Sequence, residues 1–418
     1  MIEPLSCTWA MDHLAIDLPG VSSDLLEELR EAALAAGSGR LAVVGGVVRD
    51  ALLHQRQRTT WTGVTDLDVV VEGDAAAVAS ALKRRCGSKR LTRCLEHASF
   101  ATVALTLDGF ALDLATARAE TYAAPAHNPV VRPGSLESDL VRRDFTINAM
   151  ALDLFSGELI DRHDGQTHLA ERQLVFLHPA SVADDPTRLI RAARYGARLG
   201  FDFSADALDQ AQSTLACWPW SWQPGDPADQ SPPALSTRLR MELDRLLDHE
   251  PWQQGLDLLD RWGALSLIDP GLQRDPQRSR RLRWAMRLGV PLLPALLTAA
   301  DRPLETARRL QLSGVQLTWL EQLPCLGRWA LSEAPPLDAS PSEWTQALET
   351  GGWSPGTVAL LISEQPDNWR PLLRWWGRWR HRRASLAARD LIAAGWVPGP
   401  ALGAELQRLR MVELDQGR

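Results

Sequence analysis

Residues 41–53 read LAVVGGVVRDALL, an apolar run, a glycine pair and a second run that contains Arg49 and Asp50. The first run is typical of a short buried strand, and the pattern after the glycines predicts a helix that begins near Val47. Glycine between a strand and a helix lets backbone N–H groups approach a phosphate, and the helix N-terminus favours negative charge. Gly45, Gly46 and Arg49 therefore form a candidate phosphate-binding element, although neither GxxxxGK[ST] nor GxGxxG is present.

A pair of aspartates follows in residues 65–73, which read TDLDVVVEG and predict a second strand. Asp66 and Asp68 lie two residues apart, so a strand would place both carboxylates on one face, where they repel each other. A hard cation such as Mg²⁺ relieves that repulsion, and two such ions can activate a 3′-hydroxyl and hold a triphosphate. Asp113, which lies between two leucines, is the candidate third carboxylate. The alternative is that the pair only solvates a turn, and the glycine–arginine element argues against it.

Residues 184–201 read DDPTRLIRAARYGARLGF and predict a helix with charges near its start. Asp185 and Arg188 lie three residues apart, which makes them neighbours on a helix surface. A carboxylate only accepts hydrogen bonds and a guanidinium only donates them, so the pair can accept cytosine or adenine and refuse uracil or guanine. Arg191 and Arg194 continue this stripe toward phosphates. Alternatively, an aspartate before proline caps the helix and the arginines form a solvated face.

The remaining pattern predicts an α/β domain followed by helices. Asp108-Gly109 lies between two apolar segments and indicates a β-hairpin. From Ala183 onward strand patterns vanish, and helical segments such as residues 236–265 follow. Residues 218–233, rich in Pro, Asp and Ser, predict an exposed loop or insertion. With 418 residues the chain exceeds one hydrophobic core, so several domains are expected.

Composition limits the classes of partner and compartment. The net charge of −7 weakly opposes a nucleic-acid partner, although nearly all the basic residues are arginine, which suits phosphates and base edges. No apolar run approaches the ~20 residues of a membrane span, and the N-terminus lacks the basic region of a signal peptide. The cysteines are odd in number and lack CxxC spacing, which favours reduced thiols in the cytoplasm: Cys7, Cys86, Cys94, Cys217 and Cys325.

Together these segments resemble the class II tRNA nucleotidyltransferase and poly(A) polymerase family, within the polymerase-β-like superfamily. The segments that carry the resemblance are GGVVRDALL (45–53), TDLDVVVEG (65–73), DLATARAETY (113–122), VRRDFTINAMALD (141–153) and DDPTRLIRAARYGARLGF (184–201). The resemblance implies an α/β head with a small mixed sheet, followed by an all-α neck, body and tail. We expect the head in residues 1–165, the neck with its base-reading helix in 166–250, and a body and tail that bind tRNA in 251–418.

The resemblance also implies roles for single residues. Asp66 and Asp68 would bind magnesium, and Gly46 and Arg49 would contact the triphosphate. Arg142 and Arg143 would bind the nucleotide and Asn148 would lie near its sugar, while the base would be read by Asp185 and Arg188 with Arg191 and Arg194 beside them. From the residues alone, Arg142-Arg143-Asp144 is only a charge cluster before a buried helix, INAMAL (147–152). The family usually has Glu where this chain has Asp184, and His163-Asp164 lacks the other histidines of a phosphohydrolase.

Family members add CCA, CC or A alone to tRNA, or make poly(A) tails. CC-adding members tend to lack the flexible loop after the third strand, whereas this chain keeps Arg118, Glu120 and the stretch that ends at Pro133. The expected activity is therefore CCA addition from CTP and ATP, with A addition as the alternative. Poly(A) polymerases usually carry a basic C-terminal extension, which a net charge of −7 opposes. A silent RNA-binding protein of this fold would have lost a metal carboxylate, and none is missing.

Overall fold

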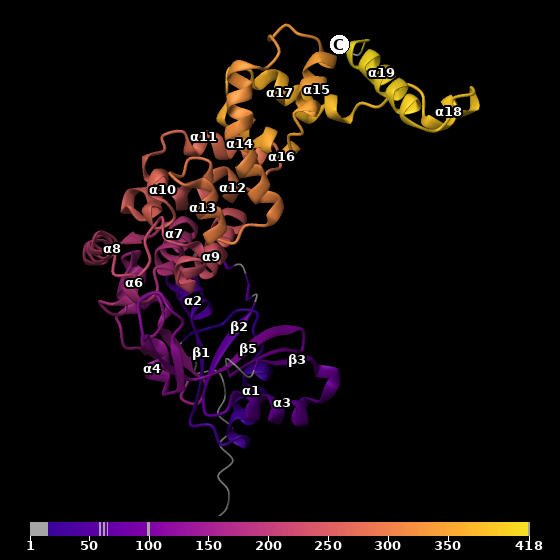
Figure 1. Cartoon of the computed structure of the whole chain (residues 1–418). Coiled ribbons are helices and arrows are strands. Elements are labelled where there is room, and N and C mark those ends of the chain that lie inside the picture. Colours follow the sequence, from indigo (N-terminus) through magenta and orange to yellow (C-terminus); the bar gives the residue numbers. More distant parts are fainter. Residues whose placement is uncertain (1–15, 58–59, 62, 65, 98–100, 417–418) are drawn as a thin grey trace, which may run out of the picture. The chain divides into compact units, whose positions relative to one another are not determined.

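The computed structural model describes residues 16–57, 60–61, 63–64, 66–97 and 101–416, which form two compact units (Figure 1). Unit 1 comprises Met1–Ser221 and unit 2 comprises Trp222–Arg418. Their boundary falls inside the range 166–250 expected for a neck. Cys7 and the N-terminal segment lie outside the described residues, and the other four cysteines are free thiols.

A seven-stranded mixed sheet, in the order β3-β4-β5-β2-β1-β8-β9, forms the centre of unit 1. β2 and β5 run parallel and the other neighbours run antiparallel. The strands are β1 (Arg40–Val44), β2 (Leu67–Glu72), β3 (Leu91–His97), β4 (Thr102–Leu107), β5 (Phe110–Thr116), β8 (Met150–Asp153) and β9 (Leu159–Asp161). The predicted hairpin is confirmed, because Asp108 and Gly109 join β4 to β5 with φ values of 51° and 86°. β3 was not predicted, since this edge strand is mostly exposed and lacks an apolar alternation.

Helices cover both faces of the sheet. α1 (Ser23–Ala35) and α3 (Ala75–Arg90) pack on each other and on the strands beside them (Figure 1). α2 (Gly46–Gln57) follows β1, as the sequence predicted. Leu136 and Leu140 of α4 (Leu136–Val141) share a buried cluster with Val70 of β2. Because alternate strand residues face opposite ways, Asp68 lies on the same face as Val70, next to α4.

The segment INAMAL forms a short turn and a strand, so the prediction of a buried helix was wrong. Residues Thr146–Asn148 form the 3-10 turn η3, and Met150–Asp153 form β8, which pairs with β1. Six apolar residues are too few for periodicity to separate a helix from a strand. The hydrogen bonds that β1 offers at its free edge decide the outcome.

Smaller elements surround this sheet in unit 1. The segment expected as a flexible loop contains an antiparallel hairpin of β6 (Arg118–Thr121) and β7 (Val130–Pro133). A short parallel pair joins β10 (Gln173–Leu174) to β11 (Asp202–Phe203). The remaining helices are α5 (Gly165–Ala170), α6 (Ser181–Asp184), α7 (Thr187–Leu199) and α8 (Ala205–Cys217).

The described part of unit 2 is helical, without strands. The prediction that strands end before Ala183 is wrong at β11 (Asp202–Phe203), a strand of two residues that is too short to show an alternating pattern. Its helices are α9 (Thr237–His249), α10 (Trp252–Trp262), α11 (Arg278–Arg287), α12 (Leu292–Leu297), α13 (Pro303–Arg309), α14 (Gly314–Ser332), α15 (Pro341–Thr350), α16 (Pro355–Glu364), α17 (Trp369–Gly377), α18 (Ala388–Ala393) and α19 (Pro400–Gln416), with short 3-10 turns between some of them. The segment 236–265 contains two helices because the helical conformation is interrupted at Glu250 and Pro251. Among the described residues, none of the helices has both the length and the apolar character that crossing a bilayer requires.

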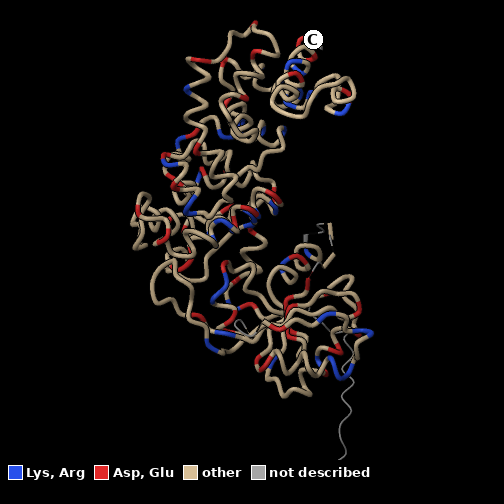
Figure 2. Tube along the Cα trace, turned by 45° about the vertical axis from the view of Figure 1, so that its right-hand side comes forward, with Lys and Arg blue, Asp and Glu red and all other residues tan. Residues whose placement is uncertain are grey.

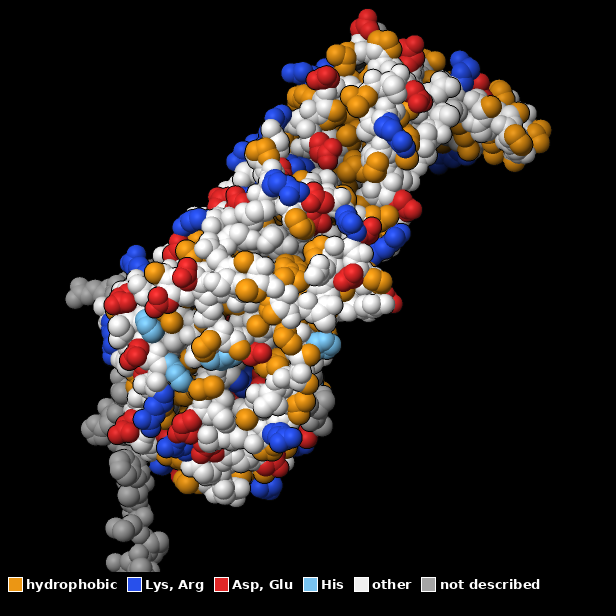
Figure 3. Space-filling model, turned by 60° about the vertical axis from the view of Figure 1, so that its left-hand side comes forward, with side chains coloured by type: hydrophobic (Ala, Val, Ile, Leu, Met, Phe, Trp, Pro, Cys, Tyr) orange, Lys and Arg blue, Asp and Glu red, His pale blue; other side chains and the backbone are white. Residues whose placement is uncertain are grey.

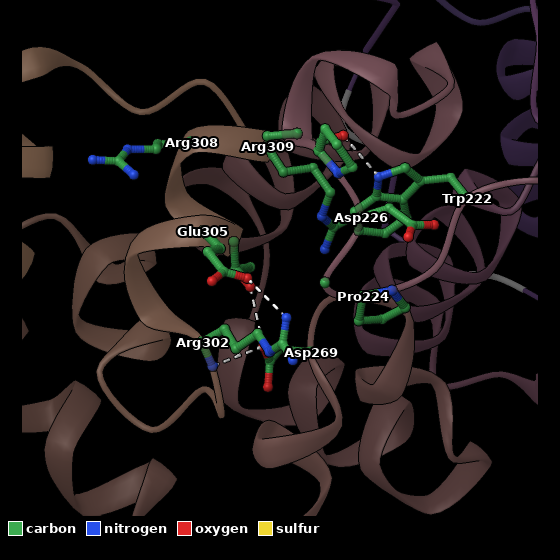
Figure 4. Close-up of a pocket in the computed structure, with 12 residues that line it drawn as sticks. Trp222, Pro224, Asp226, Asp269, Arg302, Glu305, Arg308 and Arg309 are labelled. Atoms are coloured by element: carbon green, nitrogen blue, oxygen red, sulfur yellow. Dashed lines mark hydrogen bonds and ion pairs between the residues drawn. The ribbon is translucent and has the colours of Figure 1, made fainter.

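Trp222 anchors the start of unit 2. Its ring is 5% exposed and lies 4.7 Å from the guanidinium of Arg309, and its Nε1 donates to the carbonyl of Pro227 (3.1 Å) (Figure 4). Burial lowers the pKa of Arg309 to about 10. In unit 1, Trp220 is likewise buried and donates to the carbonyl of Ala183 (2.9 Å). The expectation of an exposed loop is therefore wrong at both tryptophans, because their indoles pack and donate inward.

Charges of both signs are spread over each unit. Basic and acidic residues are mixed along the trace, and their side chains are interspersed on the face shown by the space-filling view (Figures 2 and 3).

Candidate active site

A glycine turn joins β1 to α2. Gly45 has φ of +76°, a left-handed conformation that residues with a Cβ rarely adopt. A Cβ built at Gly45 would lie 3.1 Å from Nη1 of Arg143 and 3.6 Å from Oδ2 of Asp68. α2 begins at the next residue, Gly46. The predicted phosphate-binding turn, one arginine and one carboxylate are therefore brought together.

Two of the predicted carboxylates lie side by side. β2 and β5 are parallel, and Asp68 is in register with Asp113, so both side chains leave the same face of the sheet. Asp66 lies one residue before β2. The prediction that Asp66 also lies on the strand is therefore wrong, and strand alternation does not orient its side chain.

The electrostatics of Asp68 favour a cation. Burial, helped by the charges of Asp66 and Asp113, raises the pKa of Asp68 to about 6 against the opposing charge of Arg143. Among the described residues, no three His, Cys, Asp or Glu side chains lie close enough together to hold a metal ion. Mg²⁺ is commonly bound by one or two carboxylates, with waters and substrate phosphates completing its shell. Asp66 and Asp68 fit this requirement, because the oxygens are hard donors and their repulsion would be relieved.

A cleft of about 390 Å³ opens over this face of the sheet. That volume lies within the range of small-molecule sites. Its charged or titratable lining residues are Asp68, His97, Asp113, Arg118, Arg142 and Arg143. Four of the predicted site residues therefore line one cavity: Asp68 and Asp113 on the strands, and Arg142 and Arg143 after α4.

Two carboxylates hold the arginine pair. Asp139, with no exposed surface, accepts from Nε (2.9 Å) and Nη2 (2.7 Å) of Arg142 and from Nη2 of Arg143 (3.0 Å). Glu120 of β6 accepts from Nη1 of Arg142 (3.1 Å) and from Nε of Arg118 (3.1 Å). Sequence reasoning missed Asp139, although its spacing of three and four residues from the arginines is a recognisable helical signal.

Arg49 is buried in a network, where it contacts protein groups. It is 3% exposed, and its guanidinium donates to Asp50 (2.8 and 2.9 Å) and to Oδ1 of Asn148 (2.8 Å). Nδ2 of Asn148 donates to Oδ1 of Asp144 (2.9 Å), and Arg191 of α7 donates to Oδ2 of the same carboxylate (2.8 Å). The structure therefore brings Arg49, Asn148 and Arg191 together through Asp144, which sequence reasoning had not assigned.

The charge of Asp144 is well compensated in this network. Burial alone would raise its pKa, but Arg191 and the hydrogen bond from Asn148 outweigh it and lower the pKa to about 2. Asp144 is thus a buried group, ionised at neutral pH, that links the turn after α4 to helix α7.

The predicted base-reading pair is buried and already engaged. Asp185 precedes α7, is 8% exposed, and accepts from the backbone N–H (3.1 Å) and the hydroxyl (2.6 Å) of Thr187. Arg188 is 4% exposed and donates to the carbonyl of Arg142 (2.8 Å). The prediction that the pair shares a helix surface is wrong, because α7 begins only at Thr187. The alternative, in which Asp185 caps the helix, describes its contacts, and Arg194 lies half-buried further along α7.

The β6–β7 hairpin connects the cleft with α6. Arg118 and Glu120 lie at its base, where Glu120 meets Arg142. At its tip the backbone N–H of Ala126 contacts the carbonyls of Ala183 and Asp184 (both 3.2 Å). The hairpin therefore touches the residues directly before Asp185.

A mixed sheet with paired carboxylates beside a glycine turn defines a nucleotidyltransferase head. Residues 41–175 match the poly A polymerase head domain. The CC-adding tRNA nucleotidyltransferase of Deinococcus radiodurans is 33% identical over 380 residues, which cover 88% of this chain and 83% of that relative. The chain therefore belongs to the tRNA nucleotidyltransferase family.

Other relatives match a smaller part or the fold alone. An A-adding tRNA nucleotidyltransferase of Aquifex aeolicus is 43% identical over 168 residues, 40% of this chain but only 19% of that protein. The solved structure of a CCA-adding enzyme, apo form II, has a TM-score of 0.73 at 24% identity and covers 94% of this chain and 93% of that one. The predicted family and the predicted fold, an α/β head followed by helices, are thus confirmed.

Proposed function

We propose that this protein adds CCA to the 3′ end of tRNA, using CTP and ATP without a nucleic-acid template. The observation that carries the proposal is the cleft in which Asp68, in register with Asp113, lies beside Arg143 and the Gly45 turn. Carboxylates that favour a cation and donors that favour a triphosphate are the two requirements of nucleotidyl transfer.

In this reaction the 3′ oxygen of the tRNA bonds to the α-phosphorus of the nucleotide, and the bond to the β-phosphate breaks to release pyrophosphate. Mg²⁺, when bound, would lower the pKa of the hydroxyl and stabilise the leaving group, in a two-metal arrangement. Asp66 and Asp68 would hold the cation, and Asp113 adds negative charge beside them. Arg142 and Arg143 would donate to the phosphates, which approach over the backbone at Gly45, Gly46 and the start of α2.

We assign base selection to Asp185 and Arg188. Both side chains are engaged by protein groups, so reading a base requires them to exchange Thr187 and the carbonyl of Arg142 for the nucleotide. Arg191 and Arg194 lie on the same helix, while Arg49 and Asn148 support the site through Asp144. The residues after the head, 166–250 as neck and 251–418 as body and tail, are proposed to bind the tRNA.

The hairpin of residues 118–133 supports CCA addition, because CC-adding members tend to lack this loop. CC addition is the second candidate, since the relative from Deinococcus radiodurans that matches most of the chain is a CC-adding enzyme. The relative from Aquifex aeolicus, which is 43% identical over 40% of the chain, is an A-adding enzyme.

The test uses three tRNA transcripts, ending at the discriminator base, at C and at CC, each with CTP or ATP alone. We expect CTP to extend the first two and ATP to extend the third. Incorporation of CTP alone would select CC addition, and ATP onto CC ends without CTP onto shorter ends would select A addition. Incorporation of neither nucleotide would contradict the proposed function.

A further inference from the structure

Asp139 is a buried carboxylate whose two oxygens both serve the arginines of the cleft. It has no exposed surface, and its Oδ1 accepts two hydrogen bonds from Arg142 while its Oδ2 accepts one from Arg143. An aspartate without exposed surface requires compensation by charge, because a lone buried carboxylate costs several kcal/mol. Here one carboxylate lies against two guanidinium groups, and its helical position sets both distances.

The two arginines leave Asp139 in different directions. Arg142 extends to Glu120 in the β6–β7 hairpin (3.1 Å). Arg143 places Nη1 against the Gly45 turn, and its charge acts on Asp68. The Nε of Arg143 is buried without a hydrogen-bond partner among the described residues, so Asp139 provides the hydrogen bond that orients this guanidinium.

We propose that Asp139 is a positioning residue that holds Arg143 back from Asp68 and aims both arginines at the nucleotide phosphates. This inference rests on the proposed function. Nη1 of Arg143 and Oδ2 of Asp68 both lie within 4 Å of the Cβ built at Gly45, and the charge of Arg143 already acts on Asp68, so without the charge of Asp139 we expect Arg143 to turn toward Asp68. An Arg143–Asp68 ion pair would neutralise the carboxylate that a cation requires and withdraw one phosphate donor. Asp139 therefore acts on substrate through the arginines and does not touch substrate itself.

Asp139→Asn tests the proposal, because it keeps the shape and removes the charge. We expect the KM for ATP and CTP and the half-saturating Mg²⁺ concentration each to rise about tenfold or more, with kcat changed less than about threefold. A second readout is equilibrium binding of ATP to the free protein without tRNA, which should weaken by a similar factor. Asp139→Ser, which leaves room for a water between the guanidinium groups, is the second variant if Asp139→Asn does not fold, with the same expected rises.

Asp153→Asn is the matched control. Asp153 is a buried aspartate of the same unit, but its Oδ1 accepts from the backbone N–H groups of Phe155 (2.8 Å) and Ser156 (3.1 Å) in a turn. The Asp153→Asn variant should have a lower Tm than the unaltered protein, with the same KM for nucleotides and the same Mg²⁺ requirement. The positioning role is refuted if a folded Asp139 variant leaves KM, ATP binding and Mg²⁺ dependence as in the control. If the unaltered protein binds ATP but never extends tRNA, the proposed function fails while the binding measurement still tests Asp139.

Discussion

The carboxylates of the cleft and the pair Asp185 and Arg188 at the start of α7 differ in the partners that compensate their charges. Asp68 faces the cleft among other carboxylates, and burial holds its pKa near 6. Asp185, by contrast, accepts two hydrogen bonds from Thr187, and Arg188 donates to the carbonyl of Arg142. A group whose charge is poorly compensated is arranged for a ligand, whereas a group with protein partners must release them first. Under the proposed function, the cleft is arranged for transfer in the protein alone, whereas base selection by Asp185 and Arg188 would require these residues to change their contacts.

The largest expected effect is at Asp68. Asp68→Asn should reduce nucleotide incorporation by roughly 10³-fold, because it removes a carboxylate that a catalytic cation needs. The Tm should stay the same or rise, since the change removes a charge that burial disfavours. Transfer assays and thermal unfolding measure the two outcomes. Asp74→Asn is the control, because the Asp74 carboxylate only caps α3 (2.9 Å to the N–H of Ala76), and normal turnover by Asp68→Asn would refute the metal assignment.

The next effect distinguishes base reading from capping. Asp185→Ala should lower the preference for CTP and ATP over UTP and GTP roughly 10- to 100-fold, and should also cost about 1 kcal/mol as a lost helix cap. Competition assays with all four nucleotides and denaturant unfolding measure both. Thr187→Val removes the hydroxyl donor and keeps the carboxylate, so it should affect stability alone. If Asp185→Ala and Thr187→Val show the same nucleotide selectivity, Asp185 only caps the helix and the base-reading role is contradicted.

A pH titration tests how firmly α7 is bound to the head. The pKa of Asp144 is about 2 in the folded protein against 3.8 ordinarily, which corresponds to roughly 2 kcal/mol of stability. Since the folded pKa is the lower one, this contribution is complete above about pH 4 and is lost as the pH falls toward 2. The free energy of unfolding of Asp144→Asn should therefore lie below that of the unaltered protein at pH 6 and approach it near pH 2. A difference that is constant with pH would contradict the ionised network.

The smallest expected effect concerns the turn of the cleft. Gly45→Ala should cost about 1 kcal/mol through its positive φ. It should also raise the KM for nucleotides a few-fold, because the new Cβ lies 3.1 Å from Arg143. Gly37→Ala is matched, since Gly37 also has a positive φ (+72°) but no atom within 4 Å of the added Cβ. If both variants leave KM unchanged, the approach of the turn to Arg143 is unimportant for binding.

Local features of unit 1 could be predicted from the sequence because they depend on neighbours in the chain. The Gly45 turn requires φ of +76° and Asp108-Gly109 requires two positive φ values, and these residue types adopt such conformations at little cost. The helix α7 follows from its period, and the sheet position of Asp68 follows from strand alternation. These features place the cleft and its carboxylates.

The features that depend on contacts between residues far apart in the chain were decided only by the tertiary structure. β8 is a strand because β1 offers it hydrogen bonds, and Asp144 binds Arg191 across 47 residues. The same holds for Arg188, whose partner is the carbonyl of Arg142, directly after α4 and 46 residues away. A short apolar run or a lone charge is compatible with several partners, and only packing in three dimensions selects one. The sequence by itself therefore determined the family, the glycine turn and the strand position of Asp68, whereas the orientation of the arginines and the contacts of the proposed base-reading pair were decided by the fold.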